Sequence, residues 1–390
     1  MFKKFNKIKD KYSKNKIDPR NFKLYKTISL DILTENFYNN RACIFNSFKD
    51  DNIYIVYGVN SLNLECFDVI KENKFVIINN IHAKAFDSCR HFFDKINSRD
   101  LIITSSFDSH VKITNFKREK SEVIIDLFFD SNYELIINTA YIINNKIIVP
   151  ISNKKNGIIE LYNMDSELTG KIEDAGFILG LSKFYWKEIK KYFIIIANME
   201  GVLAYNENDL SLYKKFIPSF EKEIIAGFDE AIIIEKNKNL ILISPCFYKK
   251  YLFFWDFKNG CMISKLKLDS GISDICLWDN NYIFASYNEF IAPKFILINT
   301  KYNKIEKKYN KNKYNYNRIC GIKVIRHEKK GNFIITSTIT GQLNLYKIKK
   351  HRKLFMSPIY ISTIFLFFLL FIFYILKKYF NLHKYLNYFS

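Results

Sequence analysis

One pattern recurs along this chain: a hydrophobic strand, a polar turn, and a second strand that ends in an aromatic or aliphatic residue followed by Asp, Asn or a substitute. The clearest copies are residues 101–116 and 333–348, and a third copy at 250–268 contains the dipeptide Trp255-Asp256. Helical periodicity is weak, with its main exception at 183–190. Many short strands with regular punctuation are typical of sandwiches, barrels and propellers.

The spacing of the copies selects among these folds. The residues at the Trp position are Phe67, Thr114, Tyr162, Tyr205, Trp255, Ile298 and Tyr346, with steps of 47, 48, 43, 50, 43 and 48. Periods of about 40–45 residues, with four strands each, belong to WD-repeat blades, and loop insertions account for the excess. From about residue 22 to 350 the chain therefore resembles the WD-repeat family, with seven degenerate repeats. We expect an all-β, seven-bladed WD-repeat-like β-propeller.

The residue after each Trp position shows how far the repeats have diverged. Asp68 and Asp256 keep the acid, and Lys347 departs from it. Polarity without charge is kept at Asn115, Asn163, Asn206 and Asn299. His82 and His327 stand where such repeats often place a structural His, but neither has the usual Gly partner. The Asp–His hydrogen-bond network of the family is thus not expected from the motif, and Asp108 with His110 is assigned to hydrogen bonding within one turn.

The last repeat supplies only three strands before the chain runs on, at 319–325, 333–337 and 342–348. A β-like run at 22–30 precedes the first repeat. A blade needs four strands, and closing the ring protects strand edges. We predict that the N-terminal strand completes the seventh blade, after a basic tail at 1–21.

Between Leu354 and Leu376 the chain carries no charge over 23 residues, and 14 residues follow. A helix rises about 1.5 Å per residue, so this stretch matches a hydrocarbon core of about 30 Å. The sequence predicts one C-terminal transmembrane helix over 354–376 and a short lumenal tail over 377–390. About six residues separate it from the last strand and reach roughly 20 Å, so the propeller is expected close to the bilayer.

Orientation and compartment follow from the flanks of this segment. The N-terminus has no apolar run of a signal peptide, which predicts tail anchoring with the propeller in the cytosol. Seven scattered cysteines without a C-x-x-C pair indicate reduced thiols. The strongly apolar span favours the endoplasmic reticulum membrane, and the short basic tail leaves the mitochondrial outer membrane as the alternative.

The net charge is +21, but only eight of the 60 basic residues are Arg. Nucleic-acid readers depend on the bidentate geometry of Arg, so the composition argues against nucleic acid as a partner. The segment 303–318, which interleaves Lys with Tyr, is interpreted as a low-complexity loop, with RNA binding as the lower alternative. Attraction to an anionic leaflet needs charge alone. Candidate headgroup contacts are Lys347, Lys349, Lys350, Arg352 and Lys353, together with the basic N-terminus.

No catalytic motif is found, and no metal site is predicted; His91 near Cys89 is interpreted as packing. Seven blades followed directly by a C-terminal span resemble the endoplasmic-reticulum guanine nucleotide exchange factors of the prolactin regulatory element-binding protein family. That resemblance implies a loop in the first blade that binds a potassium ion and inserts into the small GTPase that initiates COPII coats. The corresponding residues are Gly58, Val59, Asn60 and Ser61, in a loop that is shorter and lacks the Gly run.

The sequence therefore indicates two possible functions. The first is a protein-interaction platform in the secretory pathway that binds cytosolic proteins. The alternative is nucleotide exchange, which works through tighter binding of the empty GTPase and involves no bond chemistry. No cofactor is expected beyond the potassium ion of the exchange-factor alternative.

Overall fold

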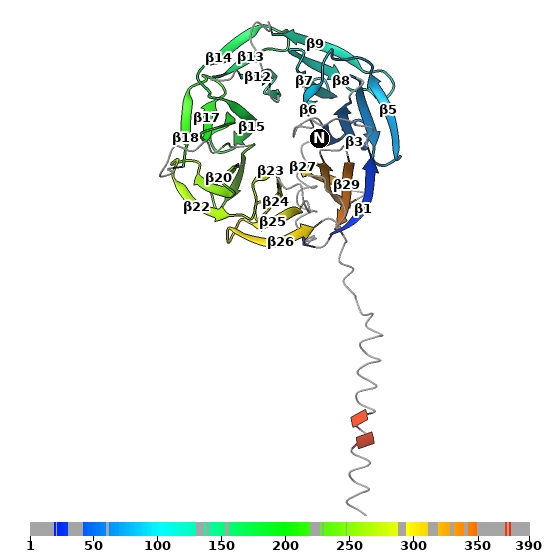
Figure 1. The fold of residues 1–390 in the computed structure, drawn as a ribbon, viewed down its shortest axis with the longest axis vertical. Helices are drawn as coiled ribbons and strands as arrows, with labels where there is room; N and C mark the ends of the chain where they lie inside the picture. Colours follow the sequence, from blue (N-terminus) through cyan, green and yellow to red (C-terminus); the bar gives the residue numbers. More distant parts are fainter. Residues whose placement is uncertain are drawn as a thin grey trace, which may run out of the picture. The chain divides into compact units, whose positions relative to one another are not determined.

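The structure is a computed structural model, and it describes residues 19–20, 22–29, 42–59, 62–129, 136–137, 140–152, 156–218, 227, 230–246, 248–287, 294–310, 319–327, 331–338, 342–348, 371–372 and 374–375. Residues 19–348 form one compact unit. Its strands build seven antiparallel sheets arranged as blades around a central axis (Figure 1). The expected seven-bladed β-propeller is confirmed.

Blades 1 to 3 follow one another along the chain. Blade 1 holds β2 (Ala42–Asn46), β3 (Ile53–Gly58), β4 (Leu64–Asp68) and β5 (Asn73–Ile78). Blade 2 holds β6 (Phe86–Asp94), β7 (Arg99–Ser106), β8 (His110–Asn115) and β9 (Glu122–Phe128). Blade 3 holds β10 (Ile136–Ile137), β11 (Tyr141–Ile143), β12 (Lys146–Ser152), β13 (Gly157–Tyr162) and β14 (Leu168–Ile172), with both β10 and β11 pairing with β12.

Blades 4 to 7 complete the ring. Blade 4 holds β15 (Ile178–Trp186), β16 (Lys191–Asn198), β17 (Val202–Asn206) and β18 (Leu212–Phe216). Blade 5 holds β19 (Ile232–Lys236), β20 (Asn239–Cys246), β21 (Tyr251–Asp256) and β22 (Met262–Lys267). Blade 6 holds β23 (Ile272–Asp279), β24 (Tyr282–Tyr287), β25 (Lys294–Asn299) and β26 (Lys304–Asn310). Blade 7 holds β27 (Ile319–His327), β28 (Gly331–Thr338), β29 (Gln342–Ile348) and β1 (Phe22–Ser29).

All seven Trp positions predicted from the repeat lie on the third strand of their blades. In blades 2 to 6 the pairing of the third and fourth strands shifts register immediately before this residue, and in blade 7 β1 shifts opposite Tyr346 and Leu345. Such a bulge increases the local twist of a strand. The recurring bulge therefore lets each outer strand follow the circumference of the ring.

The acid after the Trp position caps the turn between the third and fourth strands. The Asp68 carboxylate accepts the backbone N–H of Ile70 and of Lys71, each at 2.9 Å. Asp256 accepts the N–H of Lys258 at 2.9 Å and that of Asn259 at 3.1 Å. The side-chain oxygen of Asn163 accepts the N–H of Asp165 at 3.0 Å, and that of Asn299 accepts the N–H of Lys301 at 2.9 Å, so an Asn replaces the acid in these two turns.

The two ends of the propeller meet in blade 7. Strand β1 pairs antiparallel with β29, with Phe22 opposite Ile348 and Ser29 opposite Gln342. Ile28 is buried with the core of blades 7 and 1, and the Phe22 ring lies between those of Phe284, Phe295 and Tyr309. Pairing with β1 covers the outer edge of β29 and joins the two ends of the propeller.

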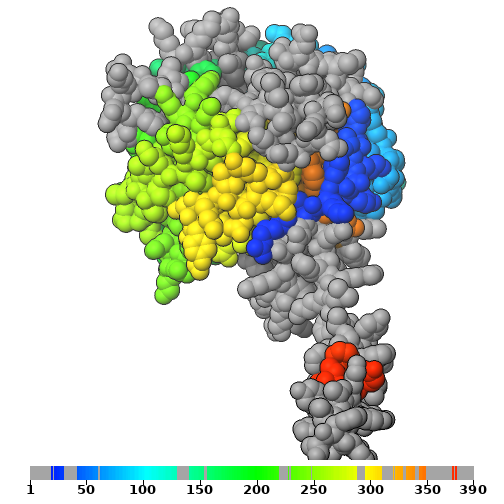
Figure 2. Space-filling view, turned by 60° about the horizontal axis from the view of Figure 1, so that its bottom comes forward, coloured from blue at the N-terminus to red at the C-terminus, as the bar shows by residue number. Residues whose placement is uncertain are grey.

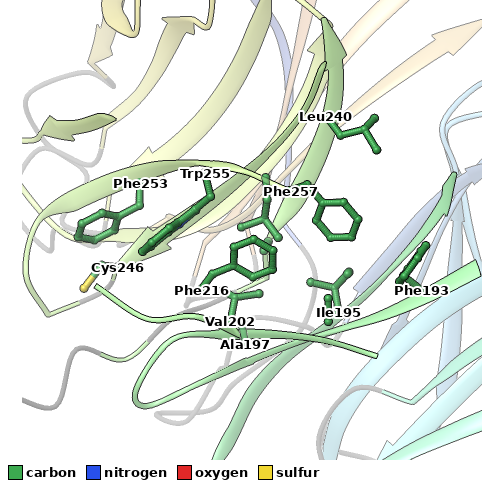
Figure 3. Packing of buried hydrophobic residues seen from close by; sticks show 13 residues of the cluster. Phe193, Ile195, Ala197, Val202, Phe216, Leu240, Cys246, Phe253, Trp255 and Phe257 are labelled. Atoms are coloured by element: carbon green, nitrogen blue, oxygen red, sulfur yellow. The ribbon is translucent and has the colours of Figure 1, made fainter. Parts of the chain in front are cut away.

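The core lies between the blades, as the cluster shared by blades 4 and 5 shows (Figure 3). Phe193 and Phe216 of blade 4 pack against Phe257, which follows β21, and the Trp255 ring lies 6.0 Å from that of Phe216. All four side chains are at most 3 % exposed. Each blade buries both faces against its neighbours, which a single four-stranded sheet cannot do.

Two expectations from the sequence are wrong. Lys183 to Trp186, within the segment 183–190 with apparent helical periodicity, belong to β15, where exposed and partly buried residues alternate as in a strand. Lys304 to Asn310, interpreted as part of a loop, form β26, the outer strand of blade 6, whose exposed side bears Lys rather than apolar residues. Residues 311–318 lie outside the described part of the chain.

The predicted transmembrane span at 354–376 also lies outside the described part, except for Phe371, Ile372, Tyr374 and Ile375, which are helical. Among residues with a described placement, we find no helix with the length and hydropathy needed to cross a bilayer. The tails at 1–18 and 377–390 are not described either.

Candidate functional site

The predicted partner-binding loop begins at the end of β3 in blade 1. A Cβ atom on Gly58 would lie 2.1 Å from a ring carbon of Phe86 in blade 2, so the glycine allows the two blades to approach. Val59 is buried, and its N–H donates to the Asn63 carbonyl at 3.1 Å. Packing accounts for these two residues, while Asn60 and Ser61 lie outside the described residues.

The predicted headgroup contacts begin at the end of β29. Lys347 is exposed, and its ammonium lies 5.6 Å from the centre of the Tyr25 ring and 5.5 Å from that of Phe333. It therefore sits on the outer side of blade 7. Lys349, Lys350, Arg352 and Lys353 fall outside the described part of the chain.

A hydrogen-bonded array in blade 2 contains the three groups of a catalytic triad: a carboxylate, an imidazole and a hydroxyl. The Nδ1 atom of His82 lies 3.1 Å from the Asp108 carboxylate, and Nε2 lies 2.9 Å from the Thr104 hydroxyl. Asp108 also accepts the N–H of Ala83 at 2.7 Å and that of His110 at 3.1 Å. The assignment of Asp108 to its own turn was therefore incomplete, because the carboxylate also holds His82.

Burial decides the role of this array. Thr104 is 0 % exposed and His82 3 % exposed, so no substrate can reach the hydroxyl. Burial is the main reason that the pKa of His82 falls to about 4, although Asp108 opposes that shift. A neutral imidazole that bridges a carboxylate and a hydroxyl fits a structural clamp. Blade 5 has a comparable bond to a hydroxyl on its second strand: the Nε1–H of Trp255 donates to the Ser244 hydroxyl at 2.9 Å.

The first strands of the blades lie around the axis of the propeller (Figure 1). Charged side chains on and beside these strands form ion pairs there. The guanidinium of Arg90 on β6 lies 2.9 Å from the Glu230 carboxylate, just before β19, and donates a second bond at 3.4 Å. Arg90 also donates to the Tyr141 hydroxyl at 3.0 Å, and that hydroxyl donates to Glu230 at 3.3 Å. Blades 2 and 5 are not neighbours, so this pair spans the centre of the ring.

Blades 6 and 7 add a second pair to the axial cluster. The Lys323 ammonium on β27 lies 3.5 Å from the Asp274 carboxylate on β23, and Asp274 accepts the N–H of Ile322 at 2.8 Å. Lys183 on β15 donates to the Ile142 carbonyl at 3.0 Å and lies 5.1 Å from the centre of the Phe92 ring. Burial, with a smaller contribution from Lys95, lowers the pKa of Lys183 to about 8.

The pKa shifts of Arg90 and Glu230 indicate that each group stabilises the charge of the other. Burial opposes ionisation of both groups, but the Glu230 charge more than offsets it and raises the pKa of Arg90. The charges of Arg90 and Lys323 likewise lower the pKa of Glu230. A buried ion pair with these additional bonds fixes geometry more than it adds stability. We interpret the axial cluster as a cross-brace of the ring.

The sequence analysis missed the axial cluster, although a signal for it exists. Lys323 stands between Ile322 and Val324, and Asp274 precedes Ile275 and Cys276, so each charge interrupts an apolar stretch of its strand, where a charge is unusual. Among the residues that the structure describes, no group of His, Cys, Asp or Glu could hold a metal ion. The cysteines with described side chains are free thiols, and Cys43 lies 3.5 Å from Cys89 between blades 1 and 2.

The seam between blades 1 and 2 ends in exposed apolar residues. The ring of His91 stacks on that of Phe45 at 3.9 Å, and its Nε2 lies 2.8 Å from the Asp100 carboxylate, so packing and one hydrogen bond account for this histidine. At the rim that carries the turn after β2, Phe48 is 50 % exposed and lies 4.4 Å from Phe93. Ile96, in the turn after β6, is 74 % exposed. Exposed apolar residues held on a rigid seam are typical of protein-binding surfaces.

These features define the class of the protein: a closed seven-bladed β-propeller whose polar interior is structural. Among solved structures, the chain is similar to a chain of the crystal structure of the Mitotic Checkpoint Complex, with a TM-score of 0.65 and 8% identity over 85% of this chain and 94% of that chain. It is also similar to a chain of the crystal structure of BBS1N in complex with ARL6DN, with a TM-score of 0.59 and 11% identity over 85% and 98% of the two chains.

A third similar structure is Raptor from Chaetomium thermophilum, with a TM-score of 0.62 and 9% identity over 88% of this chain and 30% of that chain. At such low identity these likenesses show the fold alone. No protein-family model and no curated protein sequence matches the chain.

Proposed function

We propose that this protein is an interaction platform: a cytosol-facing propeller, held at a membrane of the secretory pathway by residues 354–376, that binds other proteins. The observation that carries the proposal is the closed ring braced across its axis by Arg90 and Glu230. A rigid ring holds its turns in fixed positions, which lowers the ordering cost of binding a partner.

Two further observations support protein partners. The seam of blades 1 and 2 presents Phe48 and Ile96 to solvent, next to Lys49 and Lys95. Apolar anchors surrounded by polar residues are the usual anatomy of a protein interface. In addition, two of the similar propellers come from structures described as complexes.

Nucleotide exchange on a small GTPase is the alternative form of this function. It is favoured by seven blades followed by an uncharged 23-residue stretch. Only Asn60 and Ser61 of the proposed loop remain for contact with a GTPase, because packing accounts for Gly58 and Val59. Asn60→Lys is therefore the informative variant for this alternative.

The proposal is tested with the full-length protein in isolated membranes. Resistance to carbonate extraction and digestion of the propeller by added protease are expected, and release by carbonate would overturn the anchoring. Proximity labelling is then compared between the wild type and the pair Phe48→Ser and Ile96→Ser, with exposed Phe128→Ser as the control. The platform surface is contradicted if the labelled proteins are unchanged. Acceleration of GDP release that Asn60→Lys abolishes would select the exchange factor.

A further inference from the structure

Basic residues are unevenly distributed around the circumference of the propeller. The outer strands of blades 4 to 7 are β18, β22, β26 and β1, and they carry nine lysines against one glutamate. The outer strands of blades 1 to 3 carry two lysines against two acids. A compositional excess of Lys would be spread around all seven blades, so composition alone does not explain this asymmetry.

Seven of these lysines lie on the outer strands of the consecutive blades 5, 6 and 7, on one side of the ring (Figure 1), and are here called the lysine belt. Its members are Lys23, Lys26, Lys265, Lys267, Lys304, Lys307 and Lys308. All are exposed except Lys26, which is half-buried. Figure 2 shows blade 6 in yellow next to blue β1. Lys26 pairs with Glu72 and Lys308 with Asp269, so the charge is only partly offset.

Apolar side chains are interleaved with the belt. Leu24 and Tyr25 on β1 and Met262 and Ile263 on β22 are each between 43 % and 55 % exposed. Lysines near exposed apolar groups suit the boundary between lipid headgroups and acyl chains. Every base on these outer strands is Lys, and Lys attracts an anionic leaflet without the planar geometry that base recognition requires.

The end of the propeller lies within the same surface. Ile348 ends β29 opposite Phe22, on the blade whose outer strand is β1. Five residues separate Ile348 from Leu354, so the start of a span at 354–376 lies within about 20 Å of the end of β29. That end belongs to blade 7, whose outer strand carries Lys23 and Lys26 of the belt.

We propose that the lysine belt is a docking surface for an anionic phospholipid leaflet, so that the propeller meets the membrane by the circumference of blades 5 to 7. This orientation leaves both rims of the ring, with Phe48 and Ile96 on one of them, available to partners. The proposal deepens the membrane attachment proposed above, but the belt binds anionic lipid whether or not residues 354–376 insert.

The test uses the full-length protein and vesicles of phosphatidylcholine alone or with about one third phosphatidylserine. Lysine acetylation by a soluble reagent is mapped by mass spectrometry. On anionic vesicles at low salt, the belt lysines are expected to react at least about threefold more slowly than Lys71, Lys84, Lys120 and Lys171 of blades 1 to 3, and high salt should remove the difference. Equal reactivity on both sides of the ring would overturn the proposal.

Matched variants separate the belt from net charge. The belt variant carries Lys→Gln at positions 23, 265, 267 and 304, and the control variant carries Lys→Gln at 71, 84, 120 and 171. The belt variant should bind anionic vesicles at least about tenfold more weakly than the control variant. Equal weakening in both would show an effect of total charge and would contradict a belt.

The outcomes also distinguish failure of the anchor from failure of the belt. Belt protection on anionic vesicles with release of the protein by carbonate retains the belt and rejects the anchor. Carbonate resistance with uniform acetylation retains the anchor and rejects the belt. Protection of the same lysines by single-stranded RNA but not by anionic vesicles would reject a lipid surface in favour of nucleic acid.

Discussion

Arg90 and Glu230 stand 140 residues apart in the chain and form a bidentate ion pair, at 2.9 Å and 3.4 Å, across the centre of the ring. The pair joins blades 2 and 5, which share no interface. Removal of one partner leaves the other charge buried without its hydrogen-bonded counter-ion, because the side chains of Arg90 and Glu230 are only 12 % and 14 % exposed.

Glu230→Gln should therefore lower the free energy of unfolding by about 3 kcal/mol, measured by urea denaturation. The double variant Arg90→Met with Glu230→Leu should lose less than Glu230→Gln alone, since neither member of the pair remains as a buried charge without the other. Glu173→Gln is the control, because Glu173 is 72 % exposed in its pair with Lys171 and should contribute less than about 0.5 kcal/mol. Equal losses for Glu230→Gln and Glu173→Gln would show that the axial pair is not a brace.

His82 should make stability depend on pH. Its pKa is about 4 in the folded state against an ordinary value of 6.5, chiefly because it is buried. Between those values the unfolded chain binds the extra proton, so stability falls as pH drops from about 6.5 to 4, by about 3 kcal/mol in all. His82→Gln should flatten this part of the curve in thermal denaturation scans. An unchanged slope in that variant would mean that other groups account for it.

Gly58→Ala should destabilise the propeller by about 2 kcal/mol, because the new methyl group meets the Phe86 ring at 2.1 Å. In a Phe86→Ala background the same substitution should cost less than about 0.5 kcal/mol, since the obstructing ring is gone. The comparison is made on melting temperatures of the four proteins in the cycle. Additive losses would show that the cost of a side chain at Gly58 does not come from the Phe86 ring.

Deletion of residues 1–29 should lower the melting temperature by about 10 °C, because it removes the partner strand of β29 and the buried Ile28. Deletion of residues 1–18 is the matched control and should have little effect, since it keeps every residue of β1. Equal melting temperatures for the two truncations would show that β1 does not close the ring.

The fold could be predicted because its signals are local. Period-2 alternation and the residue at the Trp position recur in each blade, and every such residue, from Phe67 to Tyr346, lies on a third strand. The strand that begins at Lys304 was missed by this approach. An outer strand that faces solvent lacks the apolar alternation by which strands are found.

The candidate sites were harder to predict because they depend on closure. Nothing in the residues around Arg90 indicates that Glu230 will meet it, since only the full turn of the ring brings them together. The lysine belt depends in the same way on knowing which strands are outermost. His82 and Asp108 were both noticed, but their contact appears only once the loop before β6 is placed beside the turn after β7.

The join in blade 7 determines how the molecule responds to tension. Because Phe22 lies opposite Ile348, a force that separates the two chain ends loads one end of the β1–β29 ladder. The hydrogen bonds then break one after another, as in a zipper, instead of sharing the load as they would in shear. A propeller pulled by its two ends would thus open first at the β1–β29 pairing of blade 7, while the six other blades stay folded.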